Sequence, residues 1–145
     1  MKAHAWFLGV AMLALVACST SPVKLNDAKP VSPDRMYVSA TPGISDGTVI
    51  VIRDSGLLGH GCGVNIFVDD QKSATIGAGK EASIPVHAGD HILSAAPTGK
   101  GLCGLGDAEH AQRRDLKITV EPQHSITFRV GLSASGDPVF SQTSL

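Results

Sequence analysis

The sequence predicts an all-β domain, either an antiparallel β-sandwich or a small barrel of about seven or eight short strands. Runs in which apolar and polar residues alternate recur along the chain, and this period of two is typical of half-buried strands. Turn residues separate the runs roughly every eight to twelve residues, a spacing typical of sandwiches and barrels. A helical period is nearly absent after residue 18, and strands of this number and length can close one apolar core.

Eight strands are expected in all. They are Thr48–Arg53, Cys62–Val68, Ser73–Ile76, Ala82–Val86, His91–Ala96, Leu116–Val120, Ile126–Leu132 and Val139–Thr143. The first is an unbroken apolar run, which indicates burial on both faces. In the second, Val64, Ile66 and Val68 share one face with Cys62, while Asn65 lies on the other.

Polar connections between the expected strands predict tight turns. Residues 69–72 return the chain into the third strand and complete a hairpin, and residues 77–80 and 87–90 reverse it again. Residues 108–114 form either one helical turn or the approach to a strand. Alternation is clearest at Leu116–Val120 and Ile126–Leu132, which are expected to be half-buried.

Residues 18–46 are polar and contain four prolines, which predicts an extended, disordered tether. Only Met36–Ala40 could pair, as an edge strand. Gly43–Gly47 fits the pattern G-x-S-x-G of hydrolases. That motif requires a strand before it and a helix after it, and neither is expected here, so we predict a turn that enters the domain.

The first eighteen residues have the pattern of an export signal. Lys2 gives a positive start, and Trp6–Val16 is an uncharged apolar run that is too short to span a membrane. The closing Leu15-Val16-Ala17-Cys18 resembles the lipobox of bacterial lipoproteins. The resemblance implies cleavage before Cys18 and attachment of lipid, including palmitate, to its sulfur and new amino group; Ser19 after it implies the outer membrane. The alternative is an ordinary secretory signal cleaved nearby.

The expected organisation is therefore a signal peptide at 1–17, a lipidated cysteine and tether at 18–46, and a β-sandwich at 47–145. About 128 residues remain after cleavage, enough for one small domain plus a tether. The net charge of −1 becomes about −2 when Lys2 is lost. Charges of both signs are interspersed without a basic stripe, which argues against a nucleic-acid partner. A second long apolar run is missing from the sequence, so no transmembrane helix is expected.

Part of the domain resembles a group of small, uncharacterised lipoproteins of Gram-negative bacteria. The shared pieces are, in order, Arg53-Asp54-Ser55-Gly56, Gly61-Cys62, Val86–His91 and Gly101-Leu102-Cys103-Gly104. The expected hairpin and the turn after Val86 also resemble the β-modules called PEGA-type. Neither resemblance carries a known catalytic residue.

Cys62 and Cys103 remain once Cys18 is lipidated. An even pair of cysteines in an oxidising compartment predicts a disulfide. It would close a loop of about forty residues and stabilise the domain by ~4 kcal/mol in the chain-entropy model. It would also join two Gly-rich loops at one end of the sandwich. The alternatives are a metal-binding or a redox pair, and the absence of C-x-x-C makes a redox role the weaker of these.

The histidines suggest a second kind of site. His87 and His91 flank a turn and, with His60, could hold Zn or Cu. The alternative is ordinary exposed turn histidines, because this i,i+4 spacing has ligand meaning on a helix and Gly89 breaks any helix here. Gly99–Gly104 fits G-x-G-x-x-G but lacks the helix that a dinucleotide site needs. No cofactor or resident metal is expected.

These observations favour a binding or scaffolding module of the cell envelope over an enzyme, and no catalytic residue is assigned. Loops on a rigid β scaffold usually carry binding residues. The candidate contact surface is therefore Leu57, Leu58, His60 and Leu102, and the expected partner is another envelope protein. The expected location is the outer membrane, facing the periplasm. The alternative function is small-ligand or metal binding by the turn histidines.

Overall fold

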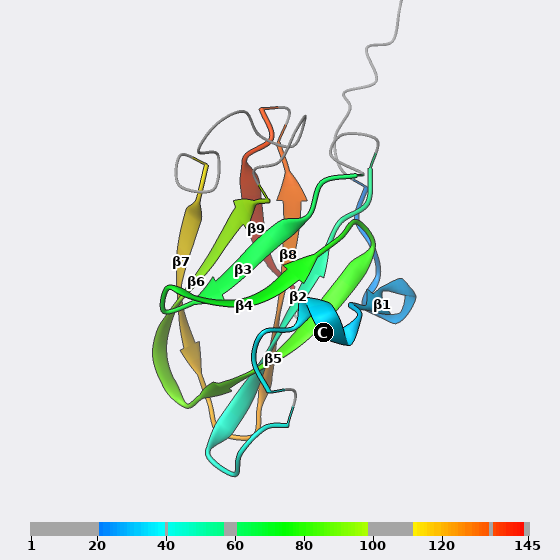
Figure 1. The fold of residues 1–145 in the computed structure, drawn as a ribbon. Coiled ribbons are helices and arrows are strands. Elements are labelled where there is room, and N and C mark those ends of the chain that lie inside the picture. The colour runs from blue at the N-terminus through cyan, green and yellow to red at the C-terminus, as the bar shows by residue number, and fades with distance from the viewer. Residues whose placement is uncertain (1–20, 40, 57–60, 99–111, 134, 144–145) are drawn as a thin grey trace, which may run out of the picture.

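The structure, a computed structural model, describes residues 21–39, 41–56, 61–98, 112–133 and 135–143. These residues form two β-sheets that pack face to face (Figure 1). The strands are β1 (Lys29–Pro30), β2 (Asp46–Arg53), β3 (Val64–Val68), β4 (Gln71–Ile76), β5 (Lys80–His87), β6 (Gly89–Pro97), β7 (Arg114–Val120), β8 (Ser125–Leu132) and β9 (Pro138–Thr143), with short 3₁₀ helices η1 (Leu25–Asp27) and η2 (Pro33–Arg35). The predicted all-β sandwich is confirmed, and the sheets do not close into a barrel.

All eight strands expected from the sequence are present, and β1 is the addition. Sheet A has the order β1-β5-β2-β8-β9, and sheet B has the order β4-β3-β6-β7. In sheet A, β2 pairs antiparallel with β5 and parallel with β8. The chain crosses between the sheets at both ends of the sandwich, so residues distant in sequence meet there.

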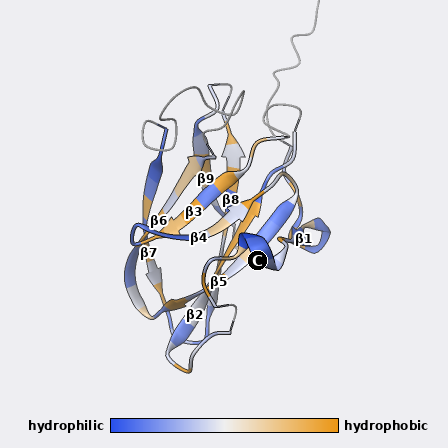
Figure 2. Ribbon diagram, viewed as in Figure 1, coloured by the Kyte–Doolittle hydropathy of each residue, from blue (hydrophilic) through white to orange (hydrophobic). Residues whose placement is uncertain are grey.

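The core lies between the sheets and is built from the alternating apolar residues. Val49 and Val51 of β2 face Ile66 of β3 and Leu93 of β6, and all four are fully buried. Figure 2 shows this apolar character concentrated along the strands. Fully burying an aliphatic side chain of this size is worth roughly 1.5–3 kcal/mol. The core therefore supplies most of the driving force for folding.

The outer face of sheet B is also covered. Asn65 and Phe67 of β3 are 2% and 7% exposed, although they lie opposite the core-facing residues. Arg113 lies over the Phe67 ring, with its guanidinium carbon 4.8 Å from the ring centroid. On the other side, the Tyr37 hydroxyl lies 3.2 Å from Thr75 Oγ1, which donates a hydrogen bond to Asn65 Oδ1 at 2.8 Å. Polar side chains thus shield the second face.

The β3–β4 hairpin turns through two aspartates. Asp69 and Asp70 have φ angles of 48° and 65°, the left-handed conformation required by a two-residue type I′ turn. The Asp69 carboxylate accepts hydrogen bonds from the His91 ring at 2.6 Å and from the Ile92 backbone N–H at 2.9 Å. These donors hold the pKa of Asp69 below its ordinary value. The turn is therefore tied to the neighbouring strand β6.

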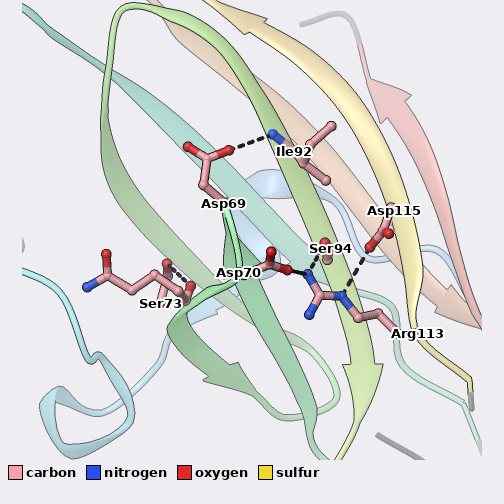
Figure 3. Close-up of polar contacts among 8 residues, drawn as sticks. Asp69, Asp70, Ser73, Ile92, Ser94, Arg113 and Asp115 are labelled. Atoms are coloured by element: carbon pink, nitrogen blue, oxygen red, sulfur yellow. Dashed lines mark hydrogen bonds and ion pairs between the residues drawn. The ribbon is translucent and has the colours of Figure 1, made fainter. Parts of the chain in front are cut away.

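The second aspartate of this turn belongs to a polar cluster around Arg113 (Figure 3). Arg113 makes an ion pair with Asp70, bonds Asp115 at 3.1 Å and donates to Ser94 Oγ at 2.9 Å. Burial lowers the pKa of the guanidinium, but the two carboxylates outweigh that effect and raise it. The hydrogen bond with Ser94 makes the largest contribution to the pKa of Asp115 and lowers it. Arg113 lowers this pKa further, although burial acts in the opposite direction. The cluster links the β3–β4 hairpin to β7.

The segment expected to be a tether differs from that expectation over residues 29–38. Lys29 and Pro30 pair in parallel with β5. Met36 forms a bridge with Ala74 of β4, as the proposed edge pairing of Met36–Ala40 implied. Together with Val31 and Val38, Met36 packs against the core. The segment covers one side of the sandwich because it offers apolar side chains and backbone groups to two exposed strand edges at once.

We call this covered side, where β5 and β4 are the neighbouring edges, the closed seam. The opposite side, where β9 and β7 are the edges, is the open seam. Here a groove of about 320 Å³ is lined by Leu116, Lys117, Ile118, Thr119, Ile126, Phe128, Phe140 and Gln142. Within the described ranges, neither β7 nor β9 has a strand paired to its outer edge. In the part of the chain that the structure describes, no helix is long and apolar enough to cross a membrane.

Candidate functional site

Three segments distant in sequence meet at one end of the sandwich, where β2 and β8 finish and β3 begins. We call this the Cys62 end and define it as residues 53–56, 61–63 and 77–80. The Gly79 N–H donates to the Arg53 carbonyl at 3.0 Å, and the Arg53 guanidinium donates to the Cys62 carbonyl. These bonds tie the β4–β5 turn and the start of β3 to the end of β2.

Arg53 is the buried charge of the Cys62 end. Its side chain is 1% exposed, and burial lowers its pKa to about 10. The guanidinium therefore remains a cation at neutral pH, with the Cys62 backbone carbonyl as one of its acceptors. A buried cation of this kind fixes the positions of the loops around it, because moving them away would leave the charge without its hydrogen bonds.

The neighbouring residue, Asp54, fixes the entry of the N-terminal segment. Its carboxylate pairs with Arg129 of β8 and accepts a hydrogen bond from the Val23 N–H at 3.3 Å. Next to it, Ser55 and Ser21 form an antiparallel bridge, in which the Ser55 N–H donates to the Ser21 carbonyl at 3.1 Å. The described chain therefore begins at the Cys62 end.

A cavity of about 470 Å³ opens beside these segments. It is lined by Pro30, Val31, Ser32, Arg35, Gly61, Cys62, Gly63, Gly77, Ala78 and Lys80. Two of these residues, Arg35 and Lys80, are cations, and none is acidic. Arg35 is exposed at the end of η2, and Lys80 is half-buried at the start of β5. Two elements that are distant in sequence thus place positive charge in one hollow.

The acidic groups closest in sequence do not line this cavity. Glu81, next to Lys80, lines a neighbouring hollow instead. Asp34 precedes Arg35, and the Ser32 hydroxyl, with a smaller contribution from Arg35, holds the pKa of Asp34 below its ordinary value. Within the described ranges, neither Arg35 nor Lys80 forms an ion pair. Among the described residues, therefore, no carboxylate forms a direct ion pair with either cation of the cavity.

All four residues of the contact surface expected from the sequence, Leu57, Leu58, His60 and Leu102, lie outside the described residues. The same is true of the expected lipidation site, Cys18, and of Cys103. Cys62 is half-buried at the rim of the cavity, and its carbonyl is held by Arg53. The Cys62–Cys103 disulfide stays a prediction.

His87 and His91 lie at the opposite end of the sandwich and bind different carboxylates. His87 Nδ1 is 2.6 Å from Asp46, while His91 Nδ1 is 2.6 Å from Asp69. His91 Nε2 lies 2.8 Å from the His87 carbonyl oxygen, so both of its ring nitrogens already face acceptors. Among the described residues, no group of three His, Cys, Asp or Glu side chains could hold a metal ion. His60 lies outside these residues.

The Gly43–Gly47 stretch forms the predicted turn. The Asp46 N–H donates to the Gly43 carbonyl at 3.1 Å, and β2 follows directly. A strand rather than a helix follows Ser45, so the elbow required by hydrolases is not formed. Gly47 is required by packing, because a Cβ there would lie 2.4 Å from the Glu121 carbonyl oxygen.

Arg35 and Lys80 are the functional candidates that the sequence did not single out. They are 45 positions apart, and Arg35 lies in a segment whose polar residues and prolines show no strand period. In comparisons with known proteins, the chain matches no family model, no curated protein and no solved structure. What the site can bind therefore follows from its own residues.

Proposed function

We propose that this protein is a lipid-anchored module of the bacterial outer membrane that faces the periplasm and binds another envelope protein. The lipobox-like Leu15–Cys18 supplies the anchor. Several acyl chains on one cysteine would hold the protein at the bilayer almost irreversibly, because each buried methylene contributes about 0.8 kcal/mol. The proposed activity is binding or scaffolding rather than catalysis.

The open seam is the observation that carries this proposal. No other described strand pairs with the outer edges of β7 and β9, and the groove between them is lined by apolar side chains of Ile126, Phe128 and Phe140. An extended segment of a partner can pair with such an edge and place alternate side chains in the groove. The closed seam supports this interpretation, because there the chain's own residues 29–38 cover two strand edges in the same way.

Site-specific photo-crosslinking in cells tests the binding surface. The photoreactive residue is placed at Lys117 or Gln142 in the open seam, and at the exposed Ser83 of β5 as the matched control. The expected result is one protein adduct of the same mass at both open-seam positions and none at Ser83. Equal adducts at all three positions, or none at the open seam, would refute the proposal.

Two further measurements test the lipid anchor at Cys18 and the predicted disulfide. Radiolabelled palmitate should enter the wild-type protein and not the Cys18→Ser variant. The mass of the purified mature protein should rise by about two hydrogens on reduction, as expected for one Cys62–Cys103 bridge. Free thiols both before and after reduction would show that the bridge is absent. A wild-type protein that takes up no palmitate would show that the lipid anchor is absent.

A further inference from the structure

We propose that the cavity at the Cys62 end binds the headgroup of an anionic phospholipid in the membrane that holds the anchor. The inference rests on the proposed function for its orientation, since it uses lipidation at Cys18. It assigns to Arg35 and Lys80 the recognition of a headgroup phosphate. The membrane would thus be a ligand of the domain as well as its attachment point.

The first argument is the position of the cavity relative to the anchor. Ser21 is bridged to Ser55 at the Cys62 end, and only Ser19 and Thr20 separate it from Cys18. Three residues cannot span more than about 11 Å, whatever path they take. An acylated Cys18 would therefore hold the Cys62 end within reach of the lipid headgroups, with the opposite, histidine-bearing end directed away from the bilayer.

The second argument is the charge of the cavity. Arg35 and Lys80 both line it, it has no acidic lining residue, and neither cation forms an ion pair within the described part of the chain. A guanidinium can bind phosphate oxygens in a bidentate manner, and an ammonium adds a compact charge. The chain as a whole has a net charge of −1, whereas the described lining of this cavity carries two positive charges and no negative one. This local excess of positive charge favours an anionic ligand.

The third argument is space. A volume of about 470 Å³ lies within the range of small-molecule sites, and a glycerophosphate headgroup fits within it. Among the described residues, no atom lies within 4 Å of the position that a Cβ on Gly61 at the rim would occupy. A headgroup can therefore approach the backbone closely there. The aliphatic walls formed by Pro30 and Val31 suit the glycerol part of the headgroup.

Vesicle co-sedimentation tests the proposal with the full mature chain carrying Cys18→Ser, which has no acyl chain of its own. The vesicles are phosphatidylcholine alone, or phosphatidylcholine with phosphatidylglycerol. The test variant is Arg35→Gln with Lys80→Gln. The matched control, Lys24→Gln with Lys72→Gln, removes the same charge at two positions that do not line the cavity. Thermal melting of each variant confirms that the fold is intact, and melting with inorganic phosphate tests for a free anion as the ligand.

We expect binding that requires phosphatidylglycerol, is weakened about fivefold by each cavity cation removed, and is nearly unchanged in the control. Equal loss in both double variants would show general surface attraction and would overturn the proposal. Binding that is independent of phosphatidylglycerol would overturn it too. A rise in melting temperature with a few millimolar phosphate, without any binding to the phosphatidylglycerol vesicles, would identify a free anion as the ligand instead. Absence of palmitate labelling in the wild type would refute the proposed function while leaving the vesicle result in place.

Discussion

The two sides of the sandwich solve the problem of exposed strand edges differently. At the closed seam, residues 29–38 pair with both β5 and β4 and add Val31, Met36 and Val38 to the core. Among the described residues, no segment covers β7 and β9 at the open seam in this way, and Phe140 stays half-buried beside the groove. The closed seam is thus completed by the chain's own residues 29–38, whereas no described segment completes the open seam.

The closed seam contributes to the stability of the fold, whereas the open seam is the surface that we propose for binding a partner. Ordering a covering segment costs roughly 1–2 kcal/mol per residue in backbone entropy, and the closed seam offsets that cost through apolar burial and backbone hydrogen bonds. The open seam avoids the cost, and it is protected from indiscriminate pairing by charged and proline residues. Arg114 and Lys117 lie exposed on β7, and Pro138 begins β9, features that natural sheets use against edge-to-edge association.

The largest expected change in the free energy of unfolding distinguishes two phenylalanines that line the open-seam groove, the buried Phe128 and the half-buried Phe140. Phe128 is 2% exposed, and its ring meets Phe140 edge-on, with centroids 6.5 Å apart. Phe128→Ala should lower the free energy of unfolding by about 3–5 kcal/mol, as for other buried aromatic residues. Phe140→Ala should cost only about 1 kcal/mol, since its ring is half exposed and loses mainly the pair contact. Urea denaturation measures both, and equal losses would mean that the open seam is packed as tightly as the core.

A smaller effect is expected from a charge placed at each seam. Met36→Asp puts a carboxylate against the core and should cost about 2 kcal/mol. Gln142→Asp in the open groove should cost less than about 0.5 kcal/mol, because that position is exposed. Hydrogen exchange should show faster exchange of the β4 amides in Met36→Asp only. If Gln142→Asp were as costly as Met36→Asp, the two seams would not differ in cover.

The smallest effect concerns the hydrogen bonds that tie Asp69, in the β3–β4 turn, to His91 and Ile92 of β6. Because the folded-state pKa of Asp69 is lowered, its contribution is present above about pH 4 and is lost as the pH falls through the folded-state value. Asp69→Asn keeps the left-handed turn, which asparagine tolerates, and removes the titrating charge. It should lower stability at pH 7 by less than about 0.5 kcal/mol, because the carboxylate is half exposed.

Thermal melts between pH 2 and pH 7 measure this link. Wild-type stability should decline more steeply below pH 4 than that of Asp69→Asn, because only the wild type loses the hydrogen-bonded carboxylate. Curves that stay parallel over the whole range would show that the bonds from His91 and Ile92 do not stabilise the charged form of Asp69.

The strands could be predicted because each carries a local signal, an unbroken apolar run in β2 and alternation in strands such as β7 and β8. Leu116, Ile118 and Val120 of β7 mark one face without reference to the rest of the chain, and the same holds for β8. The pairing of residues 29–38 could not be predicted in this way. β1 has only two residues, one of them Pro30, and its contacts are made through backbone groups that no periodic pattern reports.

The burial of Phe67 and the charge of the cavity escaped prediction for a related reason. Phe67 is covered by Arg113, which immediately precedes β7 and is distant in sequence, and the cavity combines Arg35 with Lys80 from two separate elements. Such sites are defined by where the fold brings side chains together. Cys62, which the sequence singled out only as a disulfide partner, lies at the rim of the cavity.

The turn through Asp69 and Asp70 also bears on the order of folding. A left-handed backbone costs a non-glycine residue roughly 1–2 kcal/mol, so this hairpin does not nucleate easily on its own. Its compensating partners, Ile92 and Arg113, come later in the chain. We therefore expect the β3–β4 hairpin to be stabilised only after β6 and the residues leading into β7 are in place.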